Sequence, residues 1–167
     1  MDHSLAVYLH DHMAGSKFAV ELLESLRDRY QGESLGKTAG ELVVEIEKDR
    51  AVLERVIQRV GRSSPDLKTG LAWVTEKLAR LKLGSGTEYS AGTLEAVETL
   101  TLGIQGKIAL WKSLAAIEAS DARVRGEDYQ SLIERAMDQF RVLDARRIEV
   151  ARVLFAGAVP ESEKPNA

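Results

Sequence analysis

Apolar residues recur every three or four positions along most of this chain, which is the spacing that places them on one face of an α-helix. In the first third of the sequence this pattern predicts one helix over about residues 5–30 and a second over about residues 35–60. Gly32 and Gly61 follow these two stretches and are typical of helix ends. Because the loop between the two helices is very short, we expect them to lie side by side and antiparallel.

The second part of the sequence predicts one shorter helix and two further long helices. Pro65, a residue favoured at the first position of a helix, begins an apolar pattern that continues over about residues 65–83. The long helices are expected over about residues 90–119 and 127–156, with Gly126 in the turn between them. No alternating apolar and polar run predicts a β-strand.

The long connection between the second and third long helices determines the predicted topology. A helix of about 26 residues is roughly 39 Å long, and a connector of about 30 residues with its own helix spans that length. The third long helix therefore starts at the same end of the bundle as the second. We predict an all-α four-helix bundle in up-down-down-up order, formed by a single domain over residues 1–158 and followed by a disordered tail over residues 159–167.

This layout resembles the ferritin-like superfamily, in particular its uncharacterised bacterial branches. The resemblance covers nearly the whole chain and rests on the layout of the helices, without a specific sequence motif. It implies a bundle in which a metal centre is built from a Glu on each of two helices and an E-x-x-H motif on each of the other two.

Composition narrows the function classes. The chain has 167 residues, of which 44% are hydrophobic and 29% charged, and its net charge is −3 with both signs interleaved. No cluster of Lys and Arg predicts nucleic-acid binding, and no apolar run is long enough to predict a membrane span. Cysteine is absent, which excludes thiolate chemistry and cysteine metal sites. A cytoplasmic protein is the expectation.

Histidines do not support the metal centre that the resemblance implies. The three histidines, His3, His10 and His12, all lie near the start of the first helix, and the chain contains no E-x-x-H motif. A lone inward-facing histidine such as His12 is more often a core residue than a ligand. We therefore predict no cofactor, with iron or manganese as the alternative.

The alternative metal site uses carboxylates alone. Glu21, Glu45, Glu98 and Glu149 lie at similar depths along the four long helices. On a helical wheel, however, Glu45 is at the edge of its apolar stripe and the other three face away from theirs. The interpretation that we favour is that these carboxylates are solvated.

A different set of polar residues faces the predicted core. His12 lies on the stripe of the first helix and Asp49 beside the stripe of the second, while Lys107, Asp144 and Arg147 lie on or near the apolar sides of the last two. Buried charges require neutralising partners. We therefore predict a buried or half-buried ion-pair layer that contains these five residues, with Asp49 and Asp144 opposite Arg147 and Lys107.

Three functions are open at this point. The first is a non-catalytic structural or interaction module, expected to form a homodimer or other homo-oligomer. The second is a di-iron or di-manganese protein for iron storage or redox chemistry that uses Glu45. The third is a binder of a small apolar ligand in the bundle core, which an interior cavity lined by Leu and Phe would favour.

Gly103 and Gly106 are interpreted as places where a neighbouring helix approaches closely.

Overall fold

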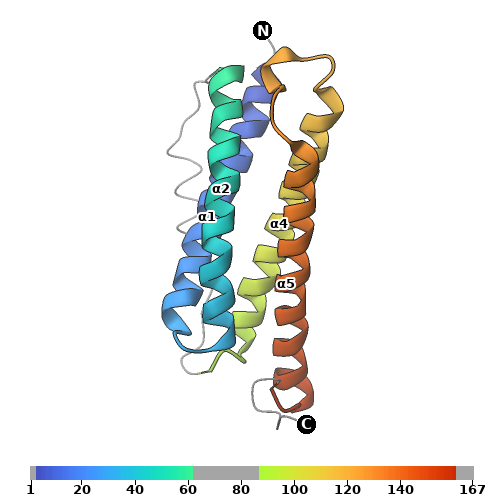
Figure 1. Cartoon of the computed structure of the whole chain (residues 1–167). Coiled ribbons are helices and arrows are strands. Elements are labelled where there is room, and N and C mark those ends of the chain that lie inside the picture. The colour runs from blue at the N-terminus through green and yellow to red at the C-terminus, as the bar shows by residue number, and fades with distance from the viewer. Residues whose placement is uncertain (1–2, 62–86, 161–167) are drawn as a thin grey trace.

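The computed structural model describes residues 3–61 and 87–160, and this part of the chain is all-α. It contains four long helices and one short 3₁₀ helix, with no strand in the described ranges (Figure 1). The elements are α1 (His3–Arg29), α2 (Ser34–Val60), α4 (Ala91–Ile117), η1 (Ala122–Val124) and α5 (Tyr129–Ala156).

The predicted all-α four-helix architecture is confirmed, and each predicted boundary of a long helix lies within two residues of the observed one. Glycines mark the turns as predicted, since Gly32, Gly61 and Gly126 have φ angles of 89°, 97° and 92°. The helix predicted over residues 65–83 lies outside the described residues, as does most of the tail predicted over residues 159–167.

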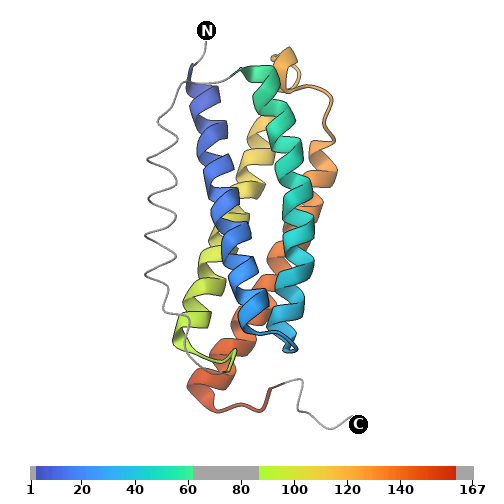
Figure 2. The ribbon, with the colours of Figure 1, turned by 90° about the vertical axis from the view of Figure 1, so that its left-hand side faces the viewer.

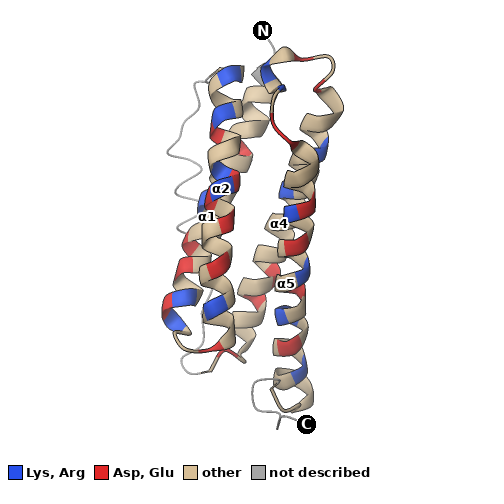
Figure 3. Cartoon of the chain, in the orientation of Figure 1, with Lys and Arg blue, Asp and Glu red and all other residues tan. Residues whose placement is uncertain are grey.

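The four helices form two antiparallel pairs. α1 packs along α2 and α4 packs along α5, whereas the contacts of α1 with α4 and of α2 with α5 are much less extensive (Figures 1 and 2). Leucines that are completely buried, among them Leu9, Leu23 and Leu114, form the core. Charged residues of both signs follow one another along the faces of α2 and α5 that are visible in Figure 3.

Hydrogen bonds hold the beginnings of α2 and α4 at the same end of the bundle. The carboxylate of Glu88 accepts a hydrogen bond from the backbone N–H of Leu35 at 2.7 Å, and that of Glu33 accepts from the N–H of Glu88 at 3.2 Å. Glu33 is the N-cap residue of α2 but makes no capping bond with its own side chain. Glu88 therefore satisfies an N–H group that the first turn of α2 leaves unpaired.

Candidate functional site

A buried carboxylate in the middle of α2 is the centre of a polar cluster inside the bundle. The side chain of Asp49 is 2% exposed. Lys107 of α4 donates from Nζ to Oδ2 of Asp49 at 2.5 Å, and Arg135 of α5 donates from Nε to Oδ1 at 2.8 Å and also from a terminal guanidinium nitrogen. Two cations from two other helices therefore neutralise this carboxylate, as its burial requires.

The amide of Gln139 connects the members of this cluster. Lys107 donates a hydrogen bond to Oε1 of Gln139. Nε2 of Gln139 donates to Glu45 at 3.0 Å and, more weakly, to Asp49 at 3.4 Å. We call Glu45, Asp49, Lys107, Arg135 and Gln139 the Asp49 cluster.

Burial dominates the electrostatics of Lys107. Removal of its ammonium group from water lowers the pKa of Lys107, and the nearby Arg135 lowers it further. Asp49 acts in the opposite direction, because a carboxylate stabilises the charged amine. The pKa of Lys107 is lowered overall, so its ammonium group loses a proton more readily than that of a lysine in water does.

The structure brings together only part of the ion-pair layer expected from the sequence. Asp49 and Lys107 are in contact, but Asp144 and Arg147 are not in the Asp49 cluster. Arg147 instead pairs with Asp144 on its own helix at 2.8 Å and lies 3.9 Å from Glu98, and all three side chains are partly exposed. Asp144 and Arg147 thus form a half-buried ion pair with each other, but the prediction that they join Asp49 and Lys107 in one layer is wrong. Asp144 is five residues beyond Gln139, which displaces it by about 7.5 Å along α5.

Arg135 and Gln139 occupy the places on α5 that were assigned to that pair. The sequence carries a signal for Gln139, which is three residues after Ala136 and four before Leu143, both of them buried. A polar residue at this spacing lies on the apolar stripe of the helix. Arg135 lies at the edge of the same stripe, where a helical wheel does not distinguish inward from outward.

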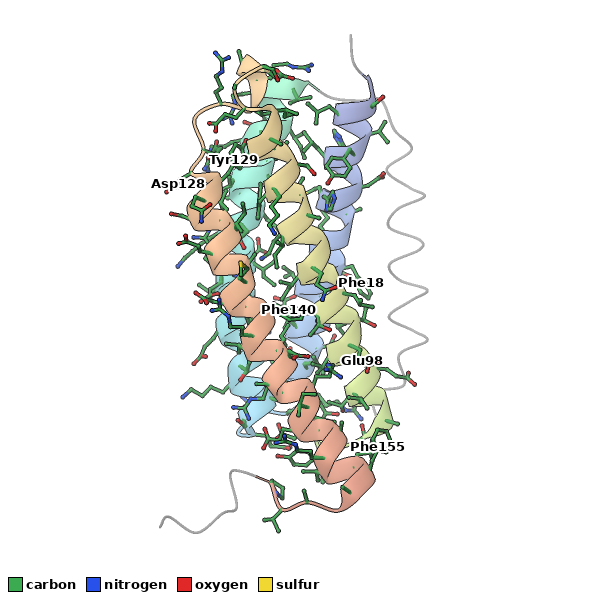
Figure 4. The ribbon with its side chains drawn as sticks, turned by 90° about the vertical axis from the view of Figure 1, so that its right-hand side faces the viewer. Phe18, Glu98, Asp128, Tyr129, Phe140 and Phe155 are labelled. Atoms are coloured by element: carbon green, nitrogen blue, oxygen red, sulfur yellow. The ribbon has the colours of Figure 1, made fainter. Side chains whose placement is uncertain are left out.

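The structure does not gather the four carboxylates of the alternative metal site. Glu21 and Glu98 are exposed, and Figure 4 shows Glu98 extending from the outer side of α4. Glu149 is only 13% exposed, so its predicted outward position is wrong, and it accepts hydrogen bonds from Arg146 and Tyr89. Across residues 3–61 and 87–160, no group of three or more His, Cys, Asp or Glu side chains is placed to hold a metal ion.

A cavity of about 550 Å³ lies between α1, α2 and α4, and the Asp49 cluster contributes Asp49 and Lys107 to its wall. Phe18, on the part of α1 next to α4 in Figure 4, lines it from one side. The wall is mostly apolar, with a few polar side chains. Its larger apolar residues include Phe18, Ile46, Leu53, Leu102, Leu110 and Trp111.

Three helical glycines leave space in this cavity. A Cβ atom added to Gly15 or Gly103 would meet no described atom within 4 Å, and one added to Gly106 would meet only Cε1 of His12, at 3.9 Å. No described helix comes within 4 Å of a Cβ position at Gly103, and the close approach of a helix to Gly103 and Gly106 stays a prediction, because the helix predicted over residues 65–83 lies outside the described residues. Glycine inside a helix costs about 1 kcal/mol relative to alanine, so these positions lower helix stability and leave those parts of the cavity wall, which are exposed at Gly15 and Gly103, without a side chain.

Tyr8, His12 and Trp111 are the polar aromatic residues among the described residues of the cavity wall. The rings of His12 and Tyr8 meet edge to face, with their centroids 4.6 Å apart. Burial lowers the pKa of His12, which favours the neutral imidazole at neutral pH. The indole N–H of Trp111 is buried, and it has no hydrogen-bond partner in the described part of the chain.

Comparisons with protein-family models, with curated proteins and with solved structures give no match for this chain. Within the described ranges, no helix combines the length and the apolar character needed to cross a bilayer. The function is therefore inferred from the geometry and chemistry of the residues described above.

Proposed function

We propose that this chain is a non-catalytic, ferritin-like bundle that binds one small, largely apolar molecule in the cavity between α1, α2 and α4. The observation that carries the proposal is the cavity itself, with a volume of about 550 Å³ and mostly apolar walls. Small-molecule sites in proteins typically enclose about 300–1,000 Å³ and combine apolar walls with a few polar groups.

The ferritin-like part of the proposal rests on the order of the helices. The hydrogen bonds of Glu33 and Glu88 hold the beginnings of α2 and α4 at one end of the bundle. Because α2 ends at the opposite end of the bundle from the beginning of α4, this placement supports up-down-down-up order.

The Asp49 cluster favours ligand binding over the di-metal alternative. In a carboxylate-bridged centre, metal ions neutralise carboxylates from several helices. Here the ammonium group of Lys107 and the guanidinium group of Arg135 neutralise Asp49. Glu45 is engaged by Gln139, so neither carboxylate lacks a partner.

The glycines of the cavity wall favour ligand binding over a purely structural role. A bundle that only has to be stable gains from larger residues at Gly15, Gly103 and Gly106, because a Cβ atom at each would meet no described atom closer than 3.9 Å. Residues that lower stability and keep a site open are characteristic of function.

Hydrocinnamyl alcohol, a phenyl ring on a short chain that ends in one hydroxyl group, is a suitable probe. We expect it to bind with one saturable site per chain, because its ring can replace water against the apolar wall. In the full-length Trp73→Phe variant the remaining tryptophan is Trp111, which lines the cavity. Fluorescence titration should therefore give a saturable change in the emission of Trp111. A change that rises linearly with the alcohol, or no change, would contradict the proposal.

A further inference from the structure

The side chain of Lys107 is unusual for a buried lysine because it belongs both to an ion-pair cluster and to the wall of a cavity. Its Nζ atom donates to Asp49 and to Gln139. An ammonium group has three N–H donors, and a neutral amine has a lone pair in the place of one of them. Two acceptors thus hold the amine, one position on the nitrogen has no acceptor among the described residues, and the Lys107 side chain forms part of the cavity wall.

The surroundings of this amine favour nucleophilic chemistry. Lysine becomes a nucleophile when burial in an apolar pocket or a neighbouring cation makes the neutral amine more accessible. Both conditions hold for Lys107, because burial and the nearby Arg135 both lower its pKa. Lys112 is exposed on the same helix and lacks these surroundings.

We propose that Lys107 captures an apolar aldehyde or ketone in the cavity as an imine. This inference rests on the proposed function, because the carbonyl compound must first occupy the cavity. The cavity wall supplies apolar surface for the body of the molecule, and Lys107, whose side chain forms part of that wall, carries the amine that would react with its carbonyl carbon.

The reaction is a condensation without an oxidant or a reductant. The neutral Nζ attacks the carbonyl carbon, a C–N bond forms, and the π electrons of the carbonyl move to its oxygen, which takes up a proton while the nitrogen loses one. The hydroxyl group then leaves with one further proton as water, and a C=N bond remains. When the imine nitrogen is protonated, it keeps the positive charge that Lys107 carried, and Asp49 continues to neutralise it.

Reductive trapping tests the inference on the full-length chain. Hydrocinnamaldehyde is added with cyanoborohydride, which transfers a hydride to the imine carbon and makes the bond permanent, and labelled lysines are located by peptide mass spectrometry. We expect Lys107 to be labelled at least about ten-fold faster than Lys112, because binding in the cavity holds the carbonyl compound beside Lys107 and turns a bimolecular encounter into a reaction within one complex. An excess of hydrocinnamyl alcohol should slow the labelling of Lys107 and leave that of Lys112 unchanged.

The matched variant is Lys107→Met, which keeps an unbranched side chain and removes the amine. It should lose the fast label while its circular dichroism spectrum remains helical. Labelling of Lys107 no faster than that of Lys112 would overturn the inference. If the alcohol still binds in that case, the proposed function stands, whereas absence of alcohol binding would contradict the proposed function itself.

Discussion

Replacement of Asp49 by asparagine is expected to lower the free energy of unfolding by about 3–5 kcal/mol, which is the usual cost of breaking a buried ion pair by removing one partner. The reason is that Lys107 and Arg135 both donate to this carboxylate. Without its charge, the ammonium group of Lys107, which is 13% exposed, remains inside the bundle with an uncharged amide as its main partner. Urea unfolding followed by circular dichroism measures the change.

Asp144→Asn is the matched control for this prediction. Asp144 also pairs with an arginine, but within one helix turn and at the surface, with 37% of its side chain exposed. Such pairs contribute about 0.2–0.5 kcal/mol. Equal losses of stability for the two variants would show that Asp49 does not act as a buried charge.

A second test is Asp49→Asn together with Lys107→Met, which should recover part of the loss because the second change removes one of the uncompensated cations.

Replacement of Gly103 by leucine is expected to weaken the binding of hydrocinnamyl alcohol at least about ten-fold, a change of roughly 1.4 kcal/mol, and to make the protein more stable. Gly103 lines the cavity, and its Cβ position is free of described neighbours. A leucine side chain therefore occupies space that the ligand needs. Its higher helix propensity should add about 0.5–1 kcal/mol to the free energy of unfolding.

The Gly103→Leu variant is expected to lose affinity for the alcohol while its stability rises, so a loss of binding cannot result from a loss of folding. Ala109→Leu is the control, because Ala109 is exposed on the same helix and does not line the cavity. It should leave the affinity for the alcohol unchanged. Equal loss of affinity in both variants would mean that the ligand does not bind in the cavity. Fluorescence titration and thermal unfolding of the two proteins measure affinity and stability.

The helices of this protein can be predicted from its sequence because their signals are local. Apolar spacing and the glycines at positions 32, 61 and 126 predict the helix ends to within two residues. The capping of α2 by Glu88 is not predictable in this way, because the two partners are 53 residues apart in the sequence. Such a contact depends on how the helices are assembled.

The candidate site could be predicted only in part, for the same reason. Asp49 interrupts an apolar stripe and is therefore recognisable as a buried charge that needs a partner. Which residues of α5 reach it depends on the register between helices, and roughly one and a half to two turns separate Gln139 from Asp144 and Arg147, the residues expected there. The cavity lies where α1 and α4 are in looser contact. The sequence pattern of a single helix does not predict how closely two helices pack.

The central claim is that a small apolar molecule binds between α1, α2 and α4, and mapping of backbone amide chemical shifts during a titration with hydrocinnamyl alcohol tests it most directly. The account predicts that the largest saturable shifts occur at Gly15, Gly103 and Gly106 and at the residues beside them on α1 and α4. Large shifts confined to exposed apolar residues away from the cavity, such as Val44 and Met137, would contradict it. Spectra that do not change at any concentration of the alcohol would contradict it as well.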